Sequence, residues 1–201
     1  MATGTLHDAF VDELRDSYGG EKQLIKALKK MAKAARTQEL RAAFESHLEE
    51  THGQVQRLDR VFAMIDEKAK GKHCDGIAGI IDEGSAVMDE DFDDATLDAC
   101  LIASGQRAEH YEMAAYGTLV AWARVLGHDE AAGLLQETLD EEKAADEKLT
   151  SLADGGINDE AAGDDEEMAE DTAKPSRSKP SRATRPRPRH GASARAPQSR
   201  S

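Results

Sequence analysis

The most constraining feature of this 201-residue chain is the return of apolar side chains every three or four residues along four long segments. This spacing gathers apolar side chains on one face of an α-helix, whereas a half-buried strand would show strict alternation. The segments cover about residues 5–35, 37–65, 94–127 and 128–153. We therefore predict four long helices.

The connections between these segments indicate how the helices are joined. The first two segments, and likewise the last two, are separated by only a few residues, which favours antiparallel hairpins. Between the hairpins lies a longer crossover with the apolar stretch CDGIAGIIDEGSAVMDED, which predicts one short helix. Only 4% of residues are aromatic, a further sign of an all-α chain. We predict a four-helix bundle with one long crossover over residues 1–153.

The composition changes after this predicted bundle. Residues 154–173 are acidic and almost free of large apolar side chains, and the following residues 174–200 are rich in Arg, Lys and Pro. Neither stretch can bury enough apolar surface to offset its ordering entropy, so we predict a disordered tail over 154–201. The basic part predicts contact with nucleic acid or with an acidic partner. A solubilising tail is the plainer alternative.

Several acidic residues fall on the apolar faces of the predicted helices. At 100° per residue, Glu21 and Glu142 lie near the centres of their apolar faces, and Glu112 lies close to the centre of its own. Glu109 takes a flank position, and Asp146 lies moderately off the centre. A single inward carboxylate is usually a boundary residue, but several on different helices call for a common explanation.

The second helix offers two alternatives within the stretch HLEETHGQ. The pair Glu49 and His52 has the Glu-x-x-His spacing of carboxylate-bridged metal sites, yet Glu49 points away from the apolar face. His47 and Gln54 point inward, and Glu50 lies on a flank from which it can reach in. We favour Glu50 with His47 as ligands, and Glu49 with His52 stays open.

The inward carboxylates are predicted to lie at one level of the bundle. Glu21 and Glu50 stand at similar distances from the first turn, as Glu112 and Glu142 do from the second, at about 1.5 Å per residue. Ionised carboxylates in an apolar core are costly unless protons, arginines or metal ions neutralise them. Few inward Lys or Arg residues are available, so we expect two divalent cations.

The same residues resemble a known family. The stretches DSYGGEKQLIKALKKMA, HLEETHGQ, GQRAEHYEMAAYGTLVAWARVLG and LLQETLDEEKAADEKLTSLA are similar to those of YciE/YciF-like ferritin-like stress proteins of bacteria. The resemblance implies a ferritin-like bundle, a homodimer, a role in stress and a dinuclear metal centre. It does not bring a settled reaction. Ala145 stands three residues after Glu142, where the ferritin-like pattern has His, so the predicted site is rich in oxygen ligands.

These observations predict a stress-associated protein with two Fe or Mn ions per chain, acting as an oxidoreductase on peroxide, oxygen or Fe²⁺. Its predicted metal ligands are Glu21, His47, Glu50, Glu109, Glu112, Glu142 and Asp146. One alternative is a protein that protects DNA or a partner through its basic tail. Another is a purely structural bundle whose inward acids are protonated or paired. With two distant cysteines, no apolar run long enough for a membrane span and no signal-peptide pattern, we expect a cytoplasmic protein.

Overall fold

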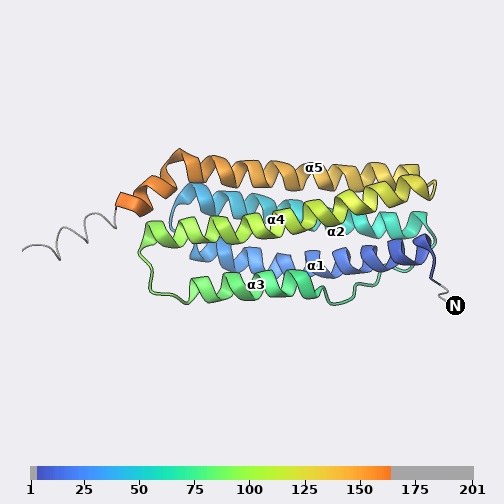
Figure 1. The fold of residues 1–201 in the computed structure, drawn as a ribbon, viewed down its shortest axis with the longest axis horizontal. Coiled ribbons are helices and arrows are strands. Elements are labelled where there is room, and N and C mark those ends of the chain that lie inside the picture. Colours follow the sequence, from blue (N-terminus) through green and yellow to red (C-terminus); the bar gives the residue numbers. More distant parts are fainter. Residues whose placement is uncertain (1–3, 164–201) are drawn as a thin grey trace, which may run out of the picture.

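The computed structural model of the protein describes residues 4–163, and these residues form helices joined by turns and one long connection (Figure 1). The elements are α1 (Leu6–Ala34), α2 (Gln38–Met64), α3 (Asp75–Met88), α4 (Asp94–Val125), α5 (Asp129–Leu152) and a π-helical turn (Ala153–Ile157). Residues 4–163 include no strand. The predicted all-α class is confirmed.

The four long helices pair as the sequence predicts. α1 packs against α2 and α4 against α5, while α2 also contacts α5 and α1 contacts α4. The short helix α3 lies along α1 and α4, outside the four-helix layer (Figure 1). Two hairpins joined by one long crossover therefore form the bundle, as expected.

Local contacts and one contact between distant residues define the ends of the helices. Thr5 caps α1 in a capping box with Asp8. The backbone of Gly127 has φ of 79° in the turn between α4 and α5, a conformation that glycine adopts without strain. In the turn between α1 and α2, the backbone N–H groups of Arg36 and Thr37 donate to the buried carboxylate of Asp98, at 2.8 and 2.7 Å. A side chain of α4 thereby holds the first hairpin turn.

The core consists of two large apolar clusters at opposite ends of the bundle, with a polar layer between them. One cluster includes Phe10, Phe62 and Leu135, and the other includes Leu28, Phe44 and Leu101. On each long helix, buried polar residues lie between the stretches that enter the two clusters. The apolar ends thus supply the burial that stabilises the bundle, and they separate the polar layer from solvent at both ends of the bundle.

The crossover approaches α1 closely at a pair of glycines directly before Glu21. A Cβ on Gly19 would lie 1.7 Å from the carbonyl oxygen of Lys72, so a larger residue there would displace the crossover. The side-chain amide of Gln23 also bonds the backbone N–H and carbonyl of Cys74, both at 3.1 Å. These contacts fix the start of α3 against the helix that carries Glu21.

The helical part of the chain continues beyond the predicted boundary at residue 153, first as a π-helical turn and then as helix to residue 163. Gly156, with φ of 136°, bends the chain back, and Ile157 packs into the apolar cluster that contains Leu28. Burial of this apolar side chain within an acidic stretch favours the extension. The remaining predictions for the tail concern residues 164–201, which lie outside the described residues.

No helix within residues 4–163 is both long enough and apolar enough to cross a membrane.

Candidate metal centre

Each of the four long helices contributes to the polar layer. Glu21 comes from α1, and His47, Thr51 and Gln54 come from α2. Glu109 and Glu112 come from α4, and Glu142 comes from α5. All seven side chains are buried, and Glu21, Gln54 and Glu142 are 0% exposed. The predicted inward orientation of His47 and Gln54 is confirmed.

Four of these residues converge on one point. His47, Glu109, Glu112 and Glu142 each offer one ligand atom, and these atoms all lie within 4.8 Å of one another. His47 Nε2 lies 3.4 Å from Glu109 Oε1 and 3.6 Å from Glu142 Oε2. One imidazole and three carboxylates form a donor set typical of iron and manganese sites.

Glu21 lies outside this group of four, but its charge interacts with that of Glu142 and Glu112. The hydroxyl of Tyr116 donates a hydrogen bond to Glu21 Oε1. Tyr116 is itself buried, and it lies on α4 one helical turn after Glu112. The spacing of Tyr116 from Glu112 places both side chains on one face of α4.

Hydrogen bonds from side chains of α2 orient Glu142 and the neighbouring Glu141 on α5. The amide Nε2 of Gln54 donates to Glu142 Oε1 at 2.5 Å and to Glu141 Oε2 at 3.2 Å. Arg57 pairs with both carboxylate oxygens of Glu141, at 2.7 and 2.9 Å. Arg57 therefore balances the charge of Glu141 and leaves that of Glu142 to other partners.

Burial and mutual repulsion act against ionisation of the cluster. Burial, followed by the charge of Glu142, raises the pKa of Glu21 and of Glu109 well above 4.5. Burial, followed by the charge of Glu21, also raises the pKa of Glu112, and burial raises the pKa of Glu142. Burial alone would lower the pKa of His47, but the nearby carboxylates outweigh it and the pKa rises. The cluster holds more negative groups than the described residues can neutralise.

Unpartnered oxygens test whether the cluster suits a cation. Glu21 Oε2, Glu109 Oε2, Glu142 Oε2 and Gln54 Oε1 are buried and accept no hydrogen bond from the described residues. Buried polar atoms are normally hydrogen-bonded, and exceptions point to a binding or catalytic role. Three of these atoms are carboxylate oxygens, the preferred ligands of hard cations. The residues present therefore fit a metal ion.

Two predicted ligands lie away from the group of four. The side chain of Glu50 is 44% exposed, and its Oε2 lies 3.3 Å from His47 Nδ1, on the side of the ring that faces away from Glu109. Asp146 Oδ1 accepts from Gln106 Nε2 at 3.1 Å and lies 3.4 Å from His110 Nε2. In this arrangement Glu50 orients the imidazole, and Asp146 belongs to the contact between α4 and α5.

The alternative ligand pair on α2, Glu49 with His52, is disfavoured because these two side chains do not point into the bundle. Glu49 is exposed and His52 is only partly buried, while Thr51 and Gln54 occupy the inward positions with the same spacing. Thr51 Oγ1 donates to the carbonyl of His47 at 2.7 Å, so its hydroxyl is directed to the backbone. The letters Glu-x-x-His are thus present on α2, but on its outer side.

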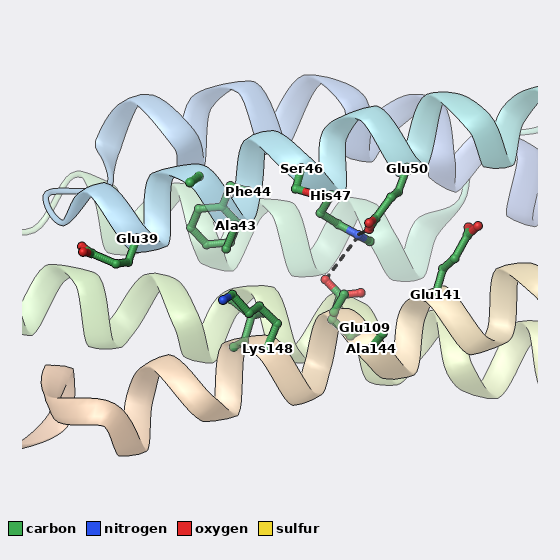
Figure 2. Close-up of a pocket in the computed structure, with 13 residues that line it drawn as sticks. Glu39, Ala43, Phe44, Ser46, His47, Glu50, Glu109, Glu141, Ala144 and Lys148 are labelled. Atoms are coloured by element: carbon green, nitrogen blue, oxygen red, sulfur yellow. Dashed lines mark hydrogen bonds and ion pairs between the residues drawn. The ribbon is translucent and has the colours of Figure 1, made fainter.

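A groove of about 550 Å³ between α2 and α5 reaches the cluster from one side (Figure 2). His47, Glu50 and Glu109 line its inner end, and alanines from both helices line its walls. In Figure 2, Glu39 lies at the other end of this groove, and Lys148 lies between Glu39 and Glu109.

Comparison with known proteins gives relatives over nearly the whole described part. The family model described as a domain of unknown function, DUF892, matches residues 5–162. Protein YciF of Escherichia coli K12 is 46% identical over 162 residues, which cover 80% of this chain and 98% of that protein.

Solved structures agree with this comparison. The crystal structure of the Escherichia coli stress protein YciF superposes with a TM-score of 0.75 at 46% identity, covering 78% of this chain and 99% of that one. YcfI of Rhodopseudomonas palustris gives a TM-score of 0.72 at 44% identity, covering 74% and 94%. A protein of Xanthomonas campestris shares the fold, with a TM-score of 0.63 at 23% identity over 81% and 99%. The chain, a bundle of two helical hairpins around buried carboxylates, therefore belongs to the DUF892 family and is a YciF-like protein.

Proposed function

We propose that the polar layer holds a dinuclear iron or manganese centre and that the protein is an oxidoreductase acting on peroxide, oxygen or Fe²⁺. The observation that carries this proposal is the set of buried carboxylate oxygens without hydrogen-bond partners, gathered beside one imidazole. Bound cations would neutralise these carboxylates, whereas burying the carboxylate charges without partners would cost more free energy. The family relationship is compatible with this role, since the Escherichia coli relative is described as a stress protein.

The positions of the proposed ligands suggest how they would be distributed between two metal ions. His47 Nε2 lies 3.4 Å from Glu109 Oε1, and Glu21 lies outside the group of four. Glu112 and Glu142 belong to the group of four and also interact with the charge of Glu21, so they would be the ligands shared between two ions. A pair of redox-active ions supplies one-electron steps that protein side chains of this kind do not supply.

The chain's own residues prepare the site for such ions. Glu50 holds the His47 ring through Nδ1, which leaves Nε2 directed at Glu109 and Glu142. Gln54 orients Glu142, and Tyr116 orients Glu21. The apolar clusters shield the carboxylates from water toward both ends of the bundle, which strengthens the electrostatic interactions between them.

Metal content is the direct test. Full-length protein expressed in medium with iron or manganese, purified without a metal-affinity tag, should carry close to two ions per chain, as expected for a dinuclear carboxylate site. Glu142→Gln should lose most of the metal, because Glu142 lies at the centre of the cluster. Glu49→Gln is the matched control on the exposed side of α2 and should keep it. Full metal content in Glu142→Gln would refute the proposed centre.

A chelator experiment separates this proposal from a purely structural bundle. If ions bind the folded protein, removing them lowers the melting temperature, and adding Mn²⁺ in excess restores it by mass action. A melting temperature that is unchanged by chelator and by Mn²⁺ would favour protonated, metal-free acids instead.

A further inference from the structure

The groove between α2 and α5 is far larger than the small molecules of the proposed reaction require. Its volume is about 550 Å³, whereas one water occupies about 30 Å³ in the liquid. Cavities of this size bind small organic molecules. Hydrogen peroxide, oxygen and Fe²⁺ are all close to water in size, so they do not account for the groove.

The walls of the groove are apolar because small residues face one another across it. Ala42 and Ala43 on α2 face Ala144 and Ala145 on α5, and Phe44 and Leu149 complete the apolar lining. Larger side chains at the alanine positions would fill the space between the helices, as they do in the two core clusters. The alanines therefore leave room for an apolar molecule.

The inner end of the groove touches the candidate metal centre. His47 and Glu109 line the groove and also belong to the group of four converging side chains. Figure 2 shows the interaction between them at this end, with Phe44 and Ala43 farther along the groove. A bound molecule can thus place one end beside the imidazole side of the centre and its body between the helices.

The charges along the groove restrict that molecule further. Four carboxyl groups line it, from Glu39, Glu50, Glu109 and Glu141, and Arg57 pairs with that of Glu141. The lining groups that can carry positive charge are Lys148 and the imidazole of His47. An anionic head group, such as the carboxylate of a fatty acid, would meet repulsion on its way inward. The groove is suited to a molecule whose reactive end is uncharged.

We propose that this groove is a binding site for a compact alkyl or aryl hydroperoxide, with the O–O–H group at His47 and Glu109 and the apolar body against the alanines. The substrate class rests on the proposed function, but the binding site does not. Reduction would cleave the O–O bond and give an alcohol and water. Two Fe²⁺ ions would supply one electron each and become Fe³⁺, and solvent would supply two protons.

The test measures binding apart from turnover. The probe is 2-phenyl-2-propanol, the alcohol that corresponds to cumene hydroperoxide, titrated into full-length, metal-free protein and followed by NMR shifts. We expect saturable binding to the wild type and a loss of about tenfold or more in affinity for Ala42→Trp and Ala144→Trp, since either indole would occupy the groove. Both positions are exposed, so the bundle tolerates the larger side chain there. Ala63→Trp, exposed on α2 outside the groove, is the control and should bind as the wild type does.

A second measurement assigns the chemistry. In iron-loaded protein with Fe²⁺ as reductant, Ala42→Trp should lower the kcat/KM for cumene hydroperoxide and leave that for hydrogen peroxide unchanged. Binding of the probe without any metal uptake would remove the proposed function but keep the groove as an apolar site. Equal probe affinity in Ala42→Trp and Ala63→Trp overturns the inference. So does a loss of self-association in the groove variants alone, because a second copy of the chain would then be the occupant.

Discussion

Glu112 offers the sharpest test of the idea that the polar layer is costly without metal. It is 5% exposed, and burial followed by the charges of Glu21, Glu142 and Glu109 raises its pKa. Replacing it with methionine keeps an unbranched side chain of good helix propensity and removes the carboxyl group. We therefore expect Glu112→Met to stabilise the metal-free protein, although it removes a buried native residue.

The magnitude follows from the cost of burying a polar group without adequate compensation. This cost is about 1–3 kcal/mol and larger for a charge, so the free energy of unfolding should rise by at least about 1 kcal/mol. For a protein of this size, about 1–3 kcal/mol corresponds to roughly 2–12 °C in melting temperature. With metal at high excess the sign reverses, because a ligand at a thousand times its Kd stabilises the wild type by about 4.1 kcal/mol and the variant forgoes this.

Thermal unfolding near neutral pH, with chelator and with excess Mn²⁺, measures both signs in one experiment. Glu49→Met is the matched control, since Glu49 is exposed on α2 and its replacement should change stability by no more than about 0.5 kcal/mol in either condition. A metal-free Glu112→Met protein that melts below the wild type would refute the reasoning. It would mean that the carboxyl group is a favourable part of the apo core.

Three further predictions concern other parts of the chain. The metal-free protein should melt at lower temperature as the pH rises from about 5 to about 8. The carboxyl groups of Glu21 and Glu112 have raised pKa values in the folded state, so they stabilise it only while they are protonated. Metal ions compete with those protons, so a saturating metal concentration should abolish the decline in a series of melting curves. Asp98→Ala should destabilise the protein by about 2–4 kcal/mol in urea unfolding, since it leaves two backbone N–H groups of the first hairpin turn without their acceptor, whereas Asp94→Ala removes only an exposed ion pair and should have little effect. The basic segment 174–200, which lies outside the described residues, is predicted to bind nucleic acid. The full chain should therefore retard DNA in a gel-shift assay at low salt, and the truncation 1–163 should not. Equal retardation by both would dismiss this prediction.

Much of the candidate centre could be predicted from helical phase, since Glu21, Glu112 and Glu142 lie near the apolar direction of their own helices and are buried as expected. For residues at the edges of the apolar faces, helical phase alone did not predict which side chains are buried. Glu109 and Glu50 both take flank positions, yet Glu109 is 3% exposed and the side chain of Glu50 is 44% exposed. The difference comes from the neighbours, because α5 covers the flank of α4, while alanines leave the groove open beside Glu50.

The sequence by itself determined the all-helical class, the two hairpins, the long crossover and the level at which the inward carboxylates meet. These depend on local periodicity and on the fixed rise of an α-helix, which are properties of short stretches of chain. Only the tertiary structure decided which side chains converge, that Tyr116 and Gln54 orient Glu21 and Glu142, and that Ile157 extends the core beyond the predicted end. Each of these depends on contacts between residues far apart in the sequence, and such contacts are set by how the helices pack rather than by the pattern on any one of them.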